Sequence, residues 1–233
     1  NFDFKSTKFF AGHSLGEYSA LVCSDSLEFN DALFLLFERG KSMQEAVPVG
    51  KGSMIAVLGS KVEELKSLIK EIKITGVCEI ANDNAEGQTI ISGDVESVNL
   101  LQNILKENKK KFIPLNVSAP FHCSLMRPAA ASMKDKIYST EFKKPFIDIV
   151  CNVNSKSENN PDEIKKLLVE QICSTVKWRE SIINMSRENV TKFIEIGPGK
   201  VLSGMVKRTV KDINCFSINS IDDMKKTVNE FKR

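Results

Sequence analysis

Residues 9–18 read FFAGHSLGEY, a stretch that joins a short apolar run to a helix-like run through a Gly-x-Ser-x-Gly turn. Residues 7–11 fit a buried strand, and the apolar side chains of residues 15–23 have helical spacing. In such a strand-turn-helix the central serine lies on a sharp bend, and its hydroxyl and the first helical amides converge on one point. The stretch therefore predicts an α/β fold with Ser14 as a candidate nucleophile.

Composition limits the classes of protein to consider. The chain has 233 residues, of which 42% are hydrophobic and 27% are charged, enough for one large domain or two small ones. A net charge of +3 is too small to indicate nucleic-acid binding, and no apolar stretch approaches the ~20 residues of a membrane span. The six cysteines are scattered without C-x-x-C spacing, which predicts reduced thiols in a reducing compartment.

Between residues 52 and 116 the pattern predicts the order β-α-β-β-α-β, with turn residues at 82–87 between the middle strands. This is the order of a ferredoxin-like unit. We expect it to be inserted into a larger α/β body formed by residues 1–51 and 117–233. The expected elements of the insert are strands 54–58, 77–81, 89–92 and 112–117 and helices 62–72 and 95–105.

The body is expected to contain further helices and strands on both sides of the insert. A helix over residues 32–43 should end before Pro48. After the insert, residues 152–161 read as a polar loop, and residues 197–199 as a Gly-Pro-Gly break. The remaining expectations are helices 124–138, 162–172, 178–187, 201–210 and a terminal helix from residue 219, with strands 146–151 and 191–196.

A serine nucleophile requires a general base, and histidine is the usual choice because its pKa lies near neutral pH. The chain has two histidines, His13 and His122. A residue adjacent to the nucleophile on a tight turn should point away from it, which leaves His122 by elimination. A purely structural histidine at a loop-to-helix junction is the alternative for His122.

Several motifs carry a resemblance to a known family. They are GHSLGEY at 12–18, ERG at 38–40 with Met43-Gln44, NDN at 82–84 with Gln88 and Ser92-Gly93, SAPFH at 118–122 and EIGPG at 195–199. In this order they resemble malonyl-CoA:acyl carrier protein transacylases over nearly the whole chain. The resemblance implies an α/β-hydrolase-like body with a ferredoxin-like subdomain, and a role in fatty-acid biosynthesis. It also implies malonyl-CoA and acyl carrier protein as substrates and partners, no cofactor or metal, a monomer, and a location in the cytoplasm or a plastid.

The resemblance also assigns catalytic roles. Ser14 is similar to the acylated serine and His122 to the general base, in a dyad without an acidic member. Gln171 matches a glutamine whose backbone carbonyl holds the histidine; a polar position on a surface helix is the alternative. The backbone N–H of Leu15 is the expected oxyanion donor.

A second set of residues is assigned to substrate binding. Arg39 resembles the arginine that grips the malonyl carboxylate with two parallel hydrogen bonds, rather than a solvated helix arginine. Met43 lies one turn further along the same helix face and is expected to line the same pocket. Phe121 resembles the malonyl-selective form of the residue before the catalytic histidine, and Asn84 is the remaining candidate.

One expected part is not in the sequence. In the family, a glutamine in a Gly-Gln-Gly-type loop near the N-terminus supplies the second oxyanion amide, and losing one such donor costs ~3 to 4 kcal/mol of transition-state stabilisation. Either residues before Asn1 are omitted or the polypeptide is a poorly active fragment. Strands expected beside Phe9 and Phe10 are also absent, which favours omission.

Two other function classes stay open at this level. A serine thioesterase or esterase would use the same nucleophile, although the standard α/β-hydrolase places its histidine late and an acid between. A non-catalytic binding fragment is favoured only by the missing oxyanion loop.

Overall fold

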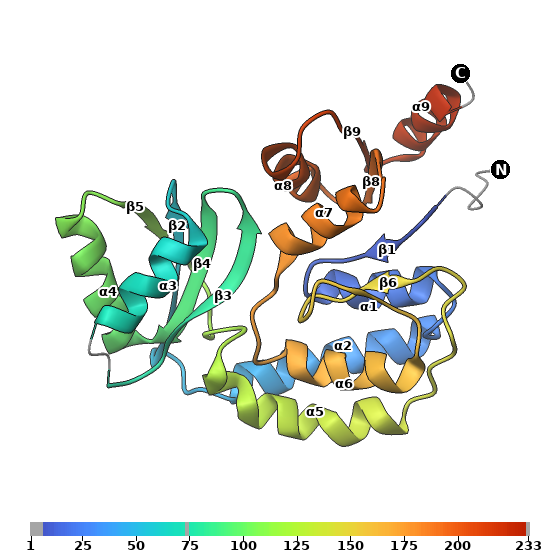
Figure 1. Ribbon diagram of the computed structural model, residues 1–233. Helices are drawn as coiled ribbons and strands as arrows, with labels where there is room; N and C mark the ends of the chain where they lie inside the picture. The colour runs from blue at the N-terminus through green and yellow to red at the C-terminus, as the bar shows by residue number, and fades with distance from the viewer. Residues whose placement is uncertain (1–6, 73–74, 232–233) are drawn as a thin grey trace.

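The computed structural model describes residues 7–72 and 75–231 of the chain, which form a mixed α/β fold (Figure 1). Its first sheet is small. Strand β1 (Phe10–Ala11) pairs in parallel with β6 (Ile149–Val150), and β7 (Ser157–Glu158) adds an antiparallel edge. Because β1 and β6 are parallel, their carboxyl ends lie together, and the helix α1 (Leu15–Cys23) begins directly beyond β1.

Four helices build the main core against this sheet: α1, α2 (Phe29–Glu45), α5 (Arg127–Ser139) and α6 (Pro161–Gln171). A short 3-10 turn, η2 (Ser124–Met126), leads into α5. Helix α6 begins one residue before the expected start, because Asn160 accepts hydrogen bonds from the Asp162 and Glu163 amides and Pro161 occupies the first turn. The core is filled by side chains that include Tyr18, Leu21, Leu35, Met126, Met133, Ile149 and Leu168.

A four-stranded antiparallel sheet lies at the other end of the molecule (Figure 1). Its strands are β2 (Gly52–Leu58), β3 (Cys78–Ala85), β4 (Gln88–Asp94) and β5 (Lys111–Pro114), in the order β3-β4-β2-β5. Helices α3 (Val62–Glu71) and α4 (Val95–Glu107) pack on it around Ile55, Leu65, Ile91 and Leu101. The element order is the β-α-β-β-α-β order that the sequence predicts.

The last part of the chain forms a separate parallel pair of strands. Helix α7 (Trp178–Arg187) leads to β8 (Lys192–Ile196), α8 (Val201–Thr209), β9 (Asn214–Ile218) and α9 (Ile221–Phe231). Strand β9 pairs in parallel with β8. Within residues 7–72 and 75–231, β8 pairs only with β9 and β1 only with β6. No helix in these described ranges is long and apolar enough to cross a bilayer.

Some sequence expectations were wrong in detail. The hairpin turn was expected at residues 82–87, but residues 82–85 continue β3 and the turn is confined to residues 86–87. The cause is tertiary pairing: the Asp83 N–H bonds the Val176 carbonyl at 3.0 Å, and the Val176 N–H bonds Ala81 at 2.9 Å. The strands expected over residues 7–11, 112–117 and 146–151 are shorter, β7 lies inside the expected loop, and β9 was not predicted.

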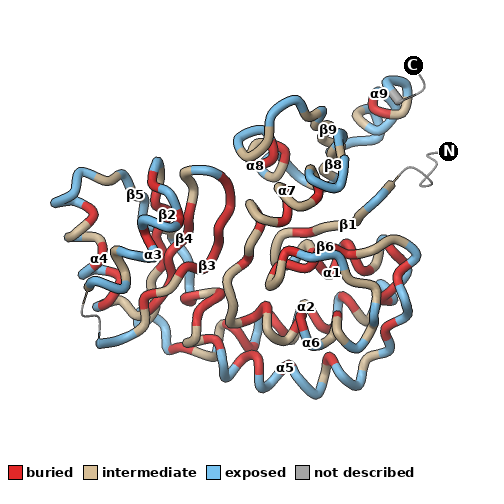
Figure 2. The backbone as a smooth tube through the Cα atoms, viewed as in Figure 1, coloured by how far each residue is buried: buried red, intermediate tan, exposed pale blue. Residues whose placement is uncertain are grey.

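Strand β3 is the principal link between the four-stranded sheet and the rest of the chain. Figure 2 shows it as an almost continuous buried stretch. The Glu79 carboxylate accepts from the Ser124 N–H (2.8 Å) and hydroxyl (2.6 Å), just after His122. Asp83 pairs with Arg179 at 2.9 Å. The strand therefore fixes the start of η2 and the start of α7 relative to the sheet.

Candidate active site

Ser14 lies at the bend between β1 and α1 with φ 52° and ψ −104°. The bend requires glycine at position 12, because a Cβ there would lie 1.9 Å from the carbonyl carbon and oxygen of Gly16. Asn152, two residues after the end of β6, holds both sides of the bend: its Oδ1 accepts from the Ser14 N–H at 2.7 Å and its Nδ2 donates to the Gly12 carbonyl at 2.8 Å. The serine hydroxyl is thus presented beyond the carboxyl ends of two parallel strands.

His122 meets the serine from the loop before α5. The distance from Ser14 Oγ to His122 Nε2 is 2.8 Å, and that from His122 Nδ1 to the Gln171 carbonyl oxygen is also 2.8 Å. A carbonyl only accepts, so Nδ1 carries the hydrogen and Nε2 presents a lone pair to the serine hydroxyl. Burial, followed by the positive charge of Arg39, lowers the pKa of His122 to about 3. The imidazole is therefore neutral at physiological pH, as a general base must be.

Arg39 projects from α2 to the same hydroxyl. Its Nη2 donates to Ser14 Oγ at 2.9 Å and to the Gln171 Oε1 at 3.0 Å, and the guanidinium lies 6.0 Å from the centre of the Tyr18 ring. The side chain is buried, yet none of the ion pairs among the described residues includes Arg39. In the same part of the chain its Nε has no hydrogen-bond partner. A buried guanidinium without a direct ion-pair partner, placed beside a nucleophile, is suited to receive a carboxylate.

The Gln171 side chain lies between these groups. Its Nε2 donates to the Ser14 carbonyl at 3.1 Å and to the Glu17 Oε2 at 3.0 Å, while its Oε1 faces Arg39. Gln171 is fully buried, so a polar position on a surface helix does not describe it. One residue thus contacts the base through its backbone and the guanidinium through its side chain.

His13 points to a different neighbourhood. Its Nε2 lies 2.8 Å from the Asn84 Oδ1, and its ring meets Trp178 edge-on with centroids 5.6 Å apart. Asn84 is buried on β3, and its side chain is bonded to His13, the residue before Ser14. Its link to the nucleophile in this structure is therefore indirect. A direct contact of Asn84 with substrate stays a prediction.

The other expected residues occupy distinct environments. Met43 is buried in the main core, one turn after Arg39. Phe121 is half-buried and packs against both the main core and the cluster of Met54, Ala56, Ala81 and Ile90. Leu15 is the first residue of α1, so its backbone N–H has no acceptor within the helix. Their roles toward substrate stay predictions.

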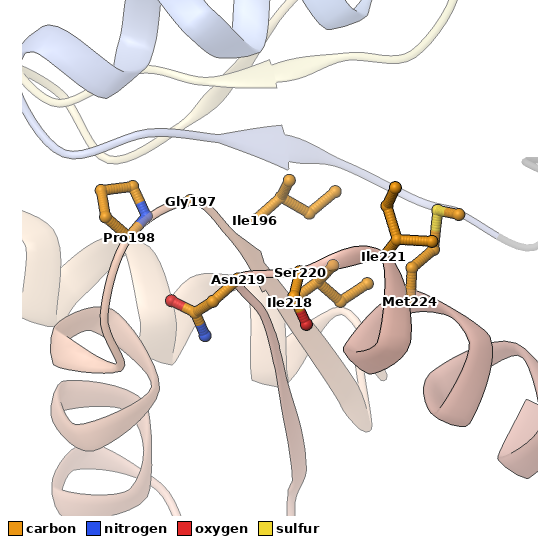
Figure 3. Close-up of a pocket in the computed structure, with 8 residues that line it drawn as sticks. All are labelled: Ile196, Gly197, Pro198, Ile218, Asn219, Ser220, Ile221 and Met224. Carbon is orange, nitrogen blue, oxygen red and sulfur yellow. The ribbon is translucent and has the colours of Figure 1, made fainter.

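An open pocket of about 540 Å³ lies away from the dyad, at the carboxyl ends of β8 and β9 (Figure 3). The Gly-Pro-Gly motif forms its rim as a turn, with Gly197 at φ 140° and Gly199 at φ 93°. Figure 3 shows the N-terminal strand passing along the open side, toward which Ile196 and Ile221 project. None of the candidate catalytic residues lines this pocket.

The sequence is similar to known proteins over nearly its whole length. The chain matches the acyl transferase domain family over residues 6–233. It is 41% identical over 226 residues to a malonyl CoA-acyl carrier protein transacylase of Bacillus subtilis, which covers 96% of this chain and 71% of that protein. The chain belongs to the acyl transferase family. The resemblance to the malonyl-CoA:acyl carrier protein transacylases of this family is confirmed.

Solved acyl transferase structures share the fold. An acyl-carrier-protein-S-malonyltransferase from Bartonella henselae matches with a TM-score of 0.96 at 36% identity, covering 100% of this chain and 75% of that one. A malonyl-transacylase solved in complex with its type II PKS acyl-carrier protein matches with a TM-score of 0.93 at 36% identity, covering 97% and 74%.

Sequence reasoning missed two polar residues of this acyl transferase site, Asn152 and Glu17. Asn152 could have been found from its position, because it lies two residues beyond a buried parallel strand, where ligand-binding polar residues are placed at the carboxyl edge of a sheet. Glu17 is an acidic residue in the first turn of α1, on the part of the helix that also buries Tyr18 and Leu21. Among the residues that the structure describes, no group of three or more His, Cys, Asp or Glu side chains is arranged to hold a metal ion.

Proposed function

We propose that the chain transfers a malonyl group from malonyl-CoA to the pantetheine thiol of acyl carrier protein through a malonyl-serine intermediate, in fatty-acid biosynthesis. Its relatives are malonyl CoA-acyl carrier protein transacylases. The observation that carries the proposal is the buried Arg39 guanidinium, 2.9 Å from the Ser14 hydroxyl and outside every ion pair of the described residues. A serine hydrolase of uncharged acyl esters would have no use for this cation.

In the first half-reaction Ser14 Oγ attacks the thioester carbonyl while His122 Nε2 accepts the hydroxyl proton. The carbonyl of Gln171 stabilises the imidazolium that forms, because it already holds Nδ1–H at 2.8 Å. The Leu15 N–H at the start of α1 faces the developing oxyanion. Collapse of the tetrahedral intermediate expels coenzyme A, which takes the proton from His122.

In the second half-reaction the pantetheine thiol gives its proton to His122 and attacks the malonyl-serine ester. Ser14 leaves and regains a proton from the imidazolium, so the enzyme returns to its initial state. Arg39 pairs with the malonyl carboxylate through both steps, while Met43, Phe121 and Asn84 line the acyl site. None of these steps requires a metal or a redox cofactor.

The finer architecture is also a proposal. Residues 1–51 and 117–233 form the α/β-hydrolase-like body, and residues 52–116 form the ferredoxin-like subdomain. The antiparallel strand order β3-β4-β2-β5 with both helices in one core supports the second assignment. The parallel β1-β6 pair with a nucleophile turn after β1 supports the first.

The proposal extends to the compartment and the oligomeric state of the chain. A reducing compartment fits the six free thiols, all of which belong to described residues. The relatives named above are bacterial, so they lend no support to a plastid location. We propose a monomer that binds acyl carrier protein transiently.

The test is acylation of Ser14 by malonyl-CoA, measured by mass spectrometry of the intact chain and its peptides, with Ser14→Ala as the control. We expect a malonyl adduct on Ser14 that moves to holo acyl carrier protein and not to the apo form, which lacks the thiol. Loss of the adduct to water in preference to the carrier would indicate a thioesterase. Binding of malonyl-CoA without any adduct would indicate a non-catalytic protein and would refute the proposal.

A further inference from the structure

Glu17 is a buried carboxylate that the reaction as described does not use. It lies on α1 one turn after Ser14 and is only 1% exposed. Its Oε2 accepts from the Asn152 N–H at 3.0 Å and from the Gln171 Nε2 at 3.0 Å. Both partners also contact the serine bend, so Glu17 lies behind the site and touches neither hydroxyl nor imidazole.

The Gln171 amide has its two ends in different surroundings. The NH2 end faces three oxygens, of the Ser14 carbonyl, Glu17 and the Asn152 side chain. The oxygen end faces the Arg39 Nη2, a donor. Turning the amide over would place an NH2 group against the guanidinium and an oxygen against the carboxylate, and both contacts would be repulsive.

We propose that Glu17 is a positioning residue for Arg39: its carboxylate fixes the Gln171 amide with Oε1 toward the guanidinium, and so determines where the acyl carboxylate is held. The proposal rests on the proposed function, in which Arg39 binds that carboxylate. It makes Glu17 a determinant of acyl selectivity, acting through Gln171.

The charges around Glu17 agree with this assignment. The ionisable groups that face it are Arg39 on α2 and the Cys151 thiol on β6, with Tyr18 beside it on α1. Burial raises the pKa of Glu17 to about 7, while its bonds with Asn152 and Gln171, and the charge of Arg39, act in the opposite direction. Above neutral pH the carboxylate is ionised, which strengthens both hydrogen bonds that it accepts.

The test compares malonyl-CoA with acetyl-CoA as donors at pH 8, because acetyl lacks the carboxylate. We expect Glu17→Ala to raise KM for malonyl-CoA about tenfold, the scale of one charge-assisted hydrogen bond, with a smaller change for acetyl-CoA. Glu17→Gln keeps an acceptor oxygen and should recover part of the selectivity. In the background of Arg39→Ala, Glu17→Ala should cause no further loss of selectivity.

Ser24→Ala is the matched control, since it removes a buried hydroxyl at the far end of the same helix. If Glu17→Ala does not fold, Glu17→Asp tests the same point, because it retains the charge but withdraws the acceptor by one methylene. Wild-type chain that transfers no malonyl group would refute the proposed function itself. Wild-type transfer with equal losses for both donors, or with no loss in the foldable variant, would overturn only the role of Glu17.

Discussion

The Oγ of Ser14 and the Nε2 of His122 lie 2.8 Å apart, although both residues have a positive φ, 52° and 58°. A non-glycine residue in this region costs on the order of 1 to 3 kcal/mol and persists only where its surroundings determine it. Here Asn152 holds the serine N–H and the Gln171 carbonyl holds the imidazole. The strained backbone places both reacting side chains before any substrate binds.

The two glycines of the serine motif should respond oppositely to alanine. Gly12→Ala would force a Cβ to 1.9 Å from Gly16 carbonyl atoms, whereas a Cβ on Gly16 meets nothing within 4 Å. We expect Gly12→Ala to destabilise the fold by ~3 kcal/mol and Gly16→Ala to stabilise α1 by up to ~1 kcal/mol. Thermal or urea unfolding measures both, and equal midpoints would contradict the geometry.

His122 should titrate far below an ordinary histidine. Its pKa is lowered to about 3 by burial and by Arg39, so the imidazole stays neutral as the pH falls through 6.5. Arg39→Ala removes the second cause and should raise the pKa, while burial keeps it below 6.5. The pKa of His122 in the wild type and in Arg39→Ala can be measured from its Cε1–H NMR resonance. The chain has two histidines, and His122→Ala assigns the two resonances. A midpoint near 6.5 in the wild type would show that the site is solvated.

Arg39 should determine the preference for a carboxylated acyl group. We expect Arg39→Ala to reduce kcat/KM for malonyl-CoA by roughly ten- to a hundredfold, because one charged hydrogen-bonding partner is lost, and to spare acetyl-CoA. Arg39→Lys should recover only part, since an ammonium cannot form two parallel bonds. Arg187→Ala, at an exposed arginine of α7, is the control. A uniform fall for both donors would argue against carboxylate recognition.

Phe121 should restrict branching at the substrate's α-carbon. Replacing its ring by the small side chain in Phe121→Ser frees volume beside His122, so kcat/KM for methylmalonyl-CoA should rise relative to malonyl-CoA. Phe37→Ser, at a phenylalanine of α2 that is 70% exposed, is the matched control. If the two donors keep their ratio in Phe121→Ser, the ring has no part in selectivity.

Glu17 should make stability depend on pH. Its pKa rises from 4.5 to about 7 on folding, so the folded chain favours the protonated carboxyl. The stability that Glu17 contributes is complete below pH 4.5 and is lost as the pH rises to 7, by up to about 3 kcal/mol. Urea unfolding of wild type and Glu17→Gln at several pH values should show their difference changing in this window. A constant difference would mean that Glu17 does not titrate there.

Periodicity predicted most of the fold because amphipathic helices such as α3 and α4 carry their packing face in the sequence. It predicted the edges of strands less well. Residues 82–84 have turn chemistry, but pairing with Val176 draws them into β3, a contact 92 or more residues away that local pattern does not contain. Strand β9 was missed because its half-buried residues give a weak alternating pattern.

Some residues of the site could be predicted from the sequence and others could not. Ser14 could be predicted because the bend has a local signature, and His122 because few bases were available. The resemblance supplied Arg39 and Gln171. Asn152 and Glu17 escaped because their function lies in hydrogen bonds across more than 130 residues, and nothing in their immediate neighbours shows the partner.

Strand β3 connects the four-stranded sheet to the catalytic residues. Along a single strand, Glu79 anchors the turn after His122, Asp83 fixes Arg179, and Asn84 holds the neighbour of Ser14. Contacts from this one strand therefore support the segments next to both reacting residues. Removing residues 52–116 would therefore remove the contacts that hold both the segment after His122 and the neighbour of Ser14.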